Sequence, residues 1–293
     1  MLTTLIEPAE LAAHLTDADW AVVDCRFDLA DTSWGERAYG AGHIPGALYA
    51  HLDRDLSGAH GPRRGRHPLP EVEALAALFG RLGINAQVQV VAYDQGPGAF
   101  AARLWWLLRW LGHPAVAVLN GGFAAWQRAG LPVNAGAEAR APRRFSAAPA
   151  PAMLFGTQQL EAALAAGELR SGATVLVDAR PADRFRGENE SLDPVAGHVP
   201  GARSHPFAGN HDAQGRWRAA PELRQAWAAT LRGTPAAAAV AMCGSGVTAC
   251  HNLLALEVAG LPGARLYAGS WSEWIRDPAH AVARERNCVT RHS

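Results

Sequence analysis

Residues 239–248 read Ala-Val-Ala-Met-Cys-Gly-Ser-Gly-Val-Thr, and this stretch decides the fold class of the chain. The apolar run that ends at Met242 predicts a buried strand over 238–242, and the residues from 248 to 259 favour a helix. Cys243 stands at the junction. A strand, a glycine-rich loop and a helix in this order are typical of α/β proteins, which bind ligands at the carboxyl ends of their strands.

Cys243 is the predicted nucleophile. Gly244 and Gly246 permit a tight loop whose N–H groups turn toward the thiol. The positive end of the following helix dipole lies at the same place, and both features favour the thiolate over the thiol. The alternative is that a free cysteine is only a small buried hydrophobe. We adopt that alternative for the remaining cysteines of the chain: Cys25, Cys250 and Cys288.

The chain repeats itself at offsets of 148 to 155 residues. The recurring motifs are AVVDCR at 21–26 and VLVDAR at 175–180, GHIPGA at 42–47 and GHVPGA at 197–202, and LNGGFAAW at 119–126 and YAGSWSEW at 267–274. So long a period predicts two homologous domains. We place them at 1–136 and 153–293, joined by a Pro/Ala-rich linker over 137–152.

Each domain alternates short apolar strands with helical segments. In the first, a helix is expected over 71–82, a strand over 88–92, a helix over 99–111 and a strand over 116–119. This alternation predicts an α/β fold in which each domain is a small parallel sheet with helices on both faces.

Composition narrows the function. The chain has 293 residues, 49% of them hydrophobic and 18% charged, as expected for a globular protein of two domains. The 27 basic and 27 acidic residues balance, so neither nucleic acid nor a membrane is an expected partner. We find no signal peptide, no membrane span and no cysteine spacing suited to zinc. Four unclustered cysteines favour reduced thiols and a cytoplasmic protein.

The two domains differ at the nucleophile. Asp94 occupies the position in the first domain that corresponds to Cys243, within Tyr-Asp-Gln-Gly-Pro-Gly. A carboxylate cannot carry a transferable sulfur. The first domain is therefore predicted to keep the scaffold without the chemistry.

Taken together, the doubled aspartate–arginine strand, the doubled Gly-His-Ile/Val-Pro-Gly-Ala turn, the tryptophan motif near each domain end and the Cys-Gly-Ser-Gly-Val-Thr loop resemble the tandem rhodanese-type sulfurtransferases. The resemblance implies a catalytic second domain and an inactive first domain. It also implies double displacement through a Cys243 persulfide, with no cofactor and no metal. The expected partners are a small anionic sulfur donor and an acceptor, which is cyanide, a small thiol or thioredoxin.

The resemblance also suggests the donor. Mercaptopyruvate sulfurtransferases resemble this chain in their loop, whereas thiosulfate-preferring rhodaneses carry basic residues at the positions of Gly244 and Ser245. Arg184 matches the family arginine that binds the anionic end of the donor. A second arginine is common nine residues later, where this chain has Asp193. That departure leaves thiosulfate open as the donor, unless Arg186 or an arginine of the first domain compensates.

Further site residues follow from the resemblance. Gly244, Gly246, Val247 and Thr248 are expected to bind the transferred sulfur through the loop backbone. Ser245 and His43 match a Ser–His–Asp relay proposed for mercaptopyruvate enzymes. The candidates that would orient the imidazole are Asp28 and Asp31. The equivalent histidine of the second domain, His198, is expected to hold its turn.

Two other functions compete with sulfur transfer. Cysteine phosphatases share related folds, but they place an arginine about six residues after the cysteine, where this chain has Ala249 and Cys250. The other alternative is a non-catalytic sulfur-carrier or binding module, which the intact loop argues against.

Overall fold

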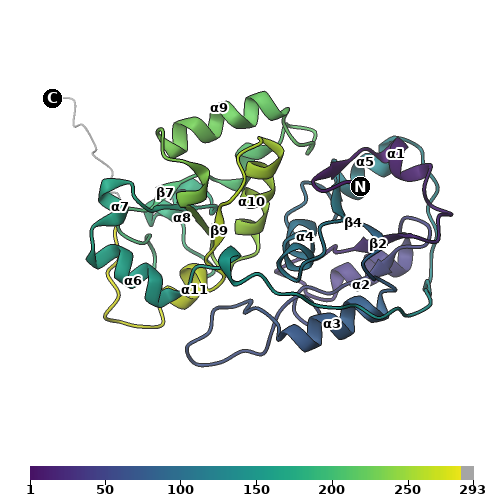
Figure 1. Ribbon diagram of the computed structural model, residues 1–293, viewed down its shortest axis with the longest axis horizontal. Coiled ribbons are helices and arrows are strands. Elements are labelled where there is room, and N and C mark those ends of the chain that lie inside the picture. The colour runs from purple at the N-terminus through teal and green to yellow at the C-terminus, as the bar shows by residue number, and fades with distance from the viewer. Residues whose placement is uncertain (285–293) are drawn as a thin grey trace.

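The computed structural model describes residues 1–284, which form two α/β domains side by side (Figure 1). The elements of the first domain are β1 (Leu5–Ile6), α1 (Pro8–Ala12), β2 (Trp20–Asp24), α2 (Trp34–Ala41), β3 (Leu48–Tyr49), α3 (Val72–Arg81), β4 (Gln89–Tyr93), α4 (Ala101–Trp110), β5 (Val116–Leu119) and α5 (Gly122–Arg128).

The helices that follow along the chain are the 3-10 helix η1 (Pro151–Met153), α6 (Thr157–Ala165), α7 (Glu168–Ser171), α8 (Ala182–Arg186), η2 (Phe207–Asn210), α9 (Ala220–Leu231), η3 (Ala236–Ala238), α10 (Thr248–Val258) and α11 (Ser270–Trp274). The strands of the second domain are β6 (Val175–Asp178), β7 (Arg203–Ser204), β8 (Ala239–Met242) and β9 (Arg265–Leu266).

One parallel sheet forms the centre of each domain. The strand order is β1-β5-β4-β2-β3 in the first and β7-β6-β8-β9 in the second. Asp24 pairs with Tyr93 at the end of β4, and Asp178 pairs with Met242 at the end of β8. The loops that follow β4 and β8 therefore leave their sheets at equivalent places. This is the carboxyl edge, where α/β sheets bind ligands.

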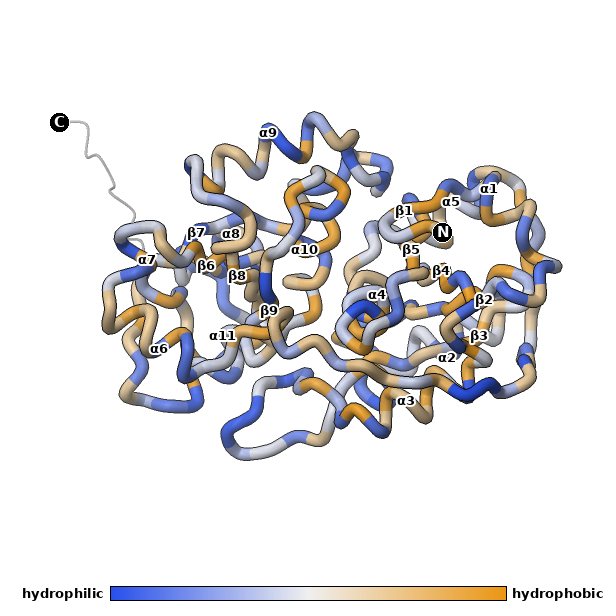
Figure 2. The backbone as a smooth tube through the Cα atoms, viewed as in Figure 1, coloured by the Kyte–Doolittle hydropathy of each residue, from blue (hydrophilic) through white to orange (hydrophobic). Residues whose placement is uncertain are grey.

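Helices cover both faces of each sheet because successive residues of a strand point to opposite faces. In β8, Val240 and Met242 join a buried cluster with residues of α6 and α11, whereas Ala239 and Ala241 join one with residues of α9 and α10. The strands are mostly coloured as hydrophobic in Figure 2. The predicted architecture, two α/β domains that each have a small parallel sheet with helices on both faces, is confirmed.

The domains share part of one apolar core, since α4 of the first packs against α10 of the second. This contact fixes how the loop after β8 faces the first domain. None of the helices in the described part of the chain is long and apolar enough to cross a membrane.

Element bounds agree with the sequence to within two residues. The helix predicted over 99–111 is α4 (Ala101–Trp110), and the helix predicted over 248–259 is α10. Residues 137–150 form neither helix nor strand. The backbone of this segment is hydrogen-bonded to the first domain, for example from Arg143 N to Gly80 O. The domain boundaries at 136 and 153 stay a prediction.

The repeated aspartate–arginine motif has a structural task in both domains. Asp24 accepts hydrogen bonds from the guanidinium of Arg26, whose Nη2 also donates to the carbonyl oxygen of Gly42 at 2.6 Å. Arg180 binds Asp178 in the same way and donates to Gly197 O at 2.7 Å. Each buried pair therefore anchors the Gly-His-x-Pro-Gly-Ala turn to the end of a central strand.

Candidate active site

The Cys243 side chain lies directly after β8 and is only 2% exposed. Its sulfur accepts hydrogen bonds from the backbone N–H of Ser245 at 3.4 Å and of Gly246 at 3.1 Å. N–H donors aimed at a sulfur favour its anionic form. The geometry therefore suits a thiolate nucleophile at the N-terminus of α10 (Thr248–Val258).

The backbone of this loop is held against α11. Trp271 N donates to Cys243 O at 3.0 Å, and Ser272 N donates to Gly244 O at 2.8 Å. Gly246 has a φ of +80°, and a Cβ there would collide with the carbonyl oxygen of Ala268. Glycine is therefore required at 246 by both its conformation and its packing.

The other described thiols lack these features. Burial raises the pKa of Cys25 well above its ordinary value and raises the pKa of Cys250 to about 12. Cys250 Sγ instead donates to Gly246 O at 3.3 Å. Both thiols are therefore protonated at neutral pH, in agreement with a packing role. Cys288 lies outside the described residues.

Ser245 contacts a histidine of the first domain, but that histidine is His67. Ser245 Oγ lies 2.7 Å from His67 Nδ1, and His67 Nε2 lies 3.2 Å from Asp53 Oδ1. Burial, followed by the nearby Arg103 and Arg66, lowers the pKa of His67 to about 3. The neutral ring donates its Nε2–H to Asp53, so Nδ1 is left to accept the hydroxyl proton of Ser245.

The prediction that His43 takes this place is wrong. His43 is fully buried, with Nδ1 bound to Tyr39 O at 2.8 Å and Nε2 at 3.5 Å from Glu138 Oε1. His198 binds Phe185 O through Nδ1 at 2.8 Å, so the two repeated histidines both hold their turns.

The aspartates predicted to orient His43 make other contacts. Asp28 accepts a hydrogen bond from the backbone N–H of Ala30. Asp31 pairs with Arg37 and Ser33, and hydrogen bonds from both side chains lower the pKa of Asp31 to about 2.

Arg184 lies beside the loop as expected. A Cβ placed on Gly244 would lie 3.7 Å from Arg184 Nη2. Arg184 Nη2 also donates to Glu190 at 2.7 Å and to Asp193 at 3.1 Å. Asp193 is in turn paired with Arg66 of the first domain. The loop thus has two guanidinium groups close by, one from each domain.

Val247 and Thr248 complete the start of α10. Val247 is buried and Thr248 half-buried. The first N–H groups of a helix have no acceptor within the helix, so those of 247–249 are available to a ligand at Cys243.

A buried arginine of α4 links the loop of Cys243 to the first domain. Arg103 is fully buried, and its guanidinium donates to backbone oxygens of both domains: Leu56, His67, Pro68 and Gly246, at 3.3 to 3.4 Å. No carboxylate of the described residues pairs with it. It ties the His67 segment to the loop of Cys243 and places a positive charge near that sulfur.

Four residues of this site were missed from the sequence: Asp53, Arg66, His67 and Arg103. The first three belong to the connection between β3 and α3, which does not take part in the repeat. Figure 1 shows that connection extending from α3 toward the second domain. Their absence from the repeat was one available signal, and Asp193 at the place of an expected arginine was another, since it suggested an arginine from the first domain.

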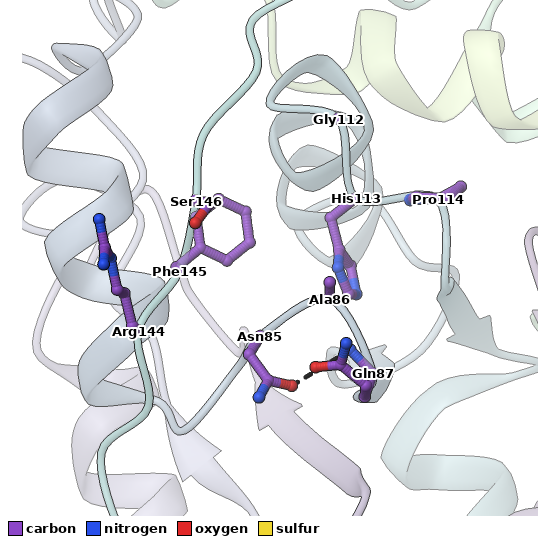
Figure 3. A pocket seen from close by; sticks show the side chains of 9 residues that line it. All are labelled: Asn85, Ala86, Gln87, Gly112, His113, Pro114, Arg144, Phe145 and Ser146. Atoms are coloured by element: carbon purple, nitrogen blue, oxygen red, sulfur yellow. Dashed lines mark hydrogen bonds between the residues drawn. The ribbon is translucent and has the colours of Figure 1, made fainter.

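The first domain also contains a cavity that lies away from Cys243. A cavity of about 310 Å³ in the first domain is lined by Asn85, Ala86, Gln87, Gly112, His113, Pro114, Arg144, Phe145 and Ser146 (Figure 3). These residues precede β4 and β5 or belong to the linker, so they lie at the amino ends of the strands. The lining contains no thiol and no carboxylate. Among residues 1–284, no cluster of His, Cys, Asp and Glu side chains is suited to a metal ion.

Comparison with known proteins assigns the family. The rhodanese-like domain family matches residues 7–129 and 157–277. The chain therefore belongs to the rhodanese family and carries two copies of its domain, which confirms the resemblance seen in the sequence.

Its relatives are named sulfurtransferases. A probable 3-mercaptopyruvate sulfurtransferase from Pseudomonas aeruginosa is 49% identical over 95% of this chain and 97% of its own length. The putative thiosulfate sulfurtransferase SseB from Mycobacterium tuberculosis is 38% identical over 96% of both proteins. The crystal structure of SseA from Escherichia coli, described as a 3-mercaptopyruvate sulfotransferase, is 32% identical and covers 92% of this chain and 100% of its own, with a TM-score of 0.80.

Proposed function

We propose that this protein is a 3-mercaptopyruvate sulfurtransferase, in which Cys243 accepts the sulfur as a persulfide and passes it to a thiol or to cyanide. The observation that carries the proposal is the arrangement around Cys243. Two N–H groups face its sulfur, and the neighbouring Ser245 contacts a neutral His67. The 49% identical relative, named a probable 3-mercaptopyruvate sulfurtransferase, supports the same donor.

In the first half-reaction the Cys243 thiolate attacks the sulfur of mercaptopyruvate. The S–S bond forms as the C–S bond breaks, and the bonding electron pair leaves on carbon as the enolate of pyruvate. The proton of the donor thiol ends on that carbon. The products are pyruvate and the Cys243 persulfide anion.

Ser245 and His67 are proposed to carry that proton. Nδ1 of His67 accepts the hydrogen bond of the Ser245 hydroxyl, which leaves the lone pairs of Oγ to the donor. The proton of the donor thiol is then proposed to pass through Oγ to the enolate carbon while the imidazole stays neutral. Asp53 orients the ring through Nε2. The neutral imidazole required here is the form that burial favours.

The persulfide anion needs donors for its outer sulfur. The free N–H groups of 247–249 are proposed to bind it, with Gly244 and Gly246 allowing the backbone to approach. Arg184 is proposed to bind the carboxylate of the donor.

The second half-reaction returns the enzyme to its starting state. A thiolate or cyanide attacks the outer sulfur, the S–S bond breaks, and its electron pair returns to Cys243. The product is the acceptor persulfide or thiocyanate. Small thiols and reduced thioredoxin are the proposed acceptors, in a reducing compartment such as the cytoplasm.

Thiosulfate is the second candidate donor. It is favoured by the 38% identical putative thiosulfate sulfurtransferase and by Asp193, which stands where a second arginine is expected. Thiosulfate leaves as sulfite and requires no proton on carbon, so it would not need the Ser245–His67 pair.

The deciding experiment compares both donors on the same preparation with cyanide as acceptor, following thiocyanate for each. We expect a larger kcat/KM with mercaptopyruvate, accompanied by one pyruvate for each sulfur transferred. A larger kcat/KM with thiosulfate contradicts the donor assignment. An absence of turnover with both donors contradicts the sulfurtransferase itself.

A further inference from the structure

A segment of the first domain, residues 65–67, lies against α11 and the loop of Cys243 in the second domain. Arg66 N donates to Ser272 Oγ at 3.0 Å, and Ser272 N donates to Gly244 O at 2.8 Å. At Gly65 a Cβ would lie 2.7 Å from the carbonyl oxygen of Gly269. This close packing fixes the backbone of Arg66 relative to the loop of Cys243.

The side chain of Arg66 extends over that loop. A Cβ placed on Gly244 would lie 2.7 Å from Arg66 Nη2, closer than the 3.7 Å to Arg184 Nη2. Two guanidinium groups from different domains therefore converge on the residue next to the nucleophile. Among the described residues, none accepts a hydrogen bond from Arg66 Nη2 or from Arg184 Nη1.

Asp193 holds the two guanidinium groups together. One of its carboxylate oxygens pairs with Arg66 Nη1 and the other with Arg184 Nη2, and its side chain is only 2% exposed. Without it, two like charges would face each other across the domain boundary. The carboxylate thus positions Arg66 while leaving its Nη2 toward Gly244.

These ion pairs belong to a linear series in which arginines and carboxylates alternate. It runs from Arg66 through Asp193, Arg184, Glu190 and Arg180 to Asp178. Three guanidinium groups balance three carboxylates. A singly charged carboxylate can then bind to the remaining N–H donors of Arg66 and Arg184. The series itself adds no net positive charge that would favour a dianion.

We propose that Arg66 binds the carboxylate of the sulfur donor together with Arg184, and that Asp193 positions Arg66 and sets the site for a singly charged donor. The proposal deepens the proposed function, because it rests on an anionic donor reaching Cys243. It makes donor recognition a task that both domains share.

The first test is Arg66→Gln, with Arg63→Gln as the matched control, since Arg63 is an exposed arginine of the same connection. Loss of one charge-assisted contact should raise KM for mercaptopyruvate about ten- to a hundredfold and leave kcat largely unchanged. Arg66→Lys should fall between, because it keeps the charge but loses the fork. Arg63→Gln should match the wild type.

A binding measurement separates this proposal from the proposed function. Pyruvate should slow the alkylation of Cys243 by iodoacetamide, and Arg66→Gln should require about ten- to a hundredfold more pyruvate for the same protection. This readout needs no sulfur transfer. A wild type that fails to use mercaptopyruvate contradicts the proposed function, whereas unchanged pyruvate protection in Arg66→Gln contradicts the role of Arg66.

Asp193→Asn tests the charge balance. It keeps a hydrogen-bond acceptor of the same shape and leaves the series with one net positive charge. The ratio of kcat/KM for thiosulfate to that for mercaptopyruvate should rise. A ratio equal to that of the wild type would show that Asp193 does not set the preference for a singly charged donor.

Discussion

The loops after β4 and β8 are held by the same backbone hydrogen bonds, but one begins with Asp94 and the other with Cys243. Phe123 N donates to Asp94 O at 2.8 Å in the first domain, as Trp271 N does to Cys243 O in the second. The next hydrogen bond is matched as well, from Ala124 N to Gln95 O at 3.0 Å. The side chain that the loop N–H groups face is different: a carboxylate in the first domain and a sulfur in the second.

In the first domain, a carboxylate already occupies the cradle of N–H groups. Asp94 accepts four backbone hydrogen bonds, from Gly96, Gly98, Phe100 and Ala101, at 2.8 to 3.3 Å. Cys243 accepts two, because its side chain is shorter than that of aspartate and ends in one acceptor atom instead of two. The free N–H groups of the second domain are therefore those that a second sulfur would use. The comparison indicates that backbone N–H groups converge on the same side-chain position in both domains.

The first domain is nevertheless part of the active site. His67 of the first domain contacts Ser245 and is itself paired with Asp53. Arg66 extends over Gly244, and Arg103 donates a hydrogen bond to Gly246 O. The first domain has Asp94 where the second has Cys243, but its side chains contribute to the proposed site in the second domain. Each prediction below tests this division of tasks.

The largest effect is expected at the nucleophile. Cys243→Ser should abolish sulfur transfer, because a hydroxyl forms no persulfide under these conditions. Cys25→Ser, Cys250→Ser and Cys288→Ser should keep most of the activity in a steady-state assay with mercaptopyruvate. Residual turnover in Cys243→Ser at the wild-type rate would assign the chemistry to another residue.

Next in size is the proton relay. Ser245→Ala and His67→Gln should each lower kcat with mercaptopyruvate about 10²- to 10⁴-fold, the usual range for general acid–base catalysis. Both variants should retain more of their activity with thiosulfate, which needs no proton on carbon. His43→Gln serves as the control, since it removes a turn contact and should lower thermal stability more than kcat. Equal losses with the two donors would speak against a relay.

A smaller effect concerns stability. Burial lowers the pKa of His67 and His251 to about 3 from an ordinary value of 6.5. Between these values the unfolded chain binds protons that the folded chain does not, so the free energy of unfolding should fall as pH drops below about 6.5. His280 acts in the opposite direction, because hydrogen bonds to Trp274 and Glu161 raise its pKa.

Urea unfolding at pH 7 and pH 5 measures this dependence. His251 Nε2 donates to Pro97 O at 2.9 Å across the domain boundary, so it titrates at the interface itself. His251→Gln should therefore show a smaller difference between the two pH values than the wild type. An identical difference in both proteins would remove His251 from the explanation.

The last prediction is that moving the cysteine to the first domain gives no activity. Asp94→Cys combined with Cys243→Ser should not restore turnover. Pro97 has no N–H to offer where Gly246 donates to the sulfur. Among the described residues the first-domain loop also has no serine–histidine contact like that of Ser245 and His67, since His251 of the second domain meets only the carbonyl oxygen of Pro97 there. Recovered activity would mean that the cradle alone suffices.

Local patterns predicted the fold and the position of Cys243 between a strand and a helix, and its role as nucleophile stays a prediction. The strand, loop and helix around Cys243 are contiguous in sequence, and so are the apolar runs of each sheet. Arg184 was placed correctly beside the loop through its motif. These features depend on neighbours in the chain, so sequence is sufficient for them.

The rest of the site depends on how the domains pack. His67 and Ser245 are 178 residues apart and meet only because α4 packs on α10. The resemblance was applied to His43, which belongs to the repeated turn, yet a repeat identifies what both domains need, which is the fold. Residues for chemistry are required once, so they lie where the two copies differ.

The most direct test of the account is a single turnover with a limiting amount of mercaptopyruvate and no acceptor. Intact-mass measurement and peptide mapping should find one added sulfur on the peptide of Cys243, with one pyruvate released for each sulfur bound. His67→Gln should form the same adduct far more slowly, while His43→Gln should form it at close to the wild-type rate. An adduct on another cysteine, or a His67→Gln variant as fast as the wild type, would contradict an active site built from both domains.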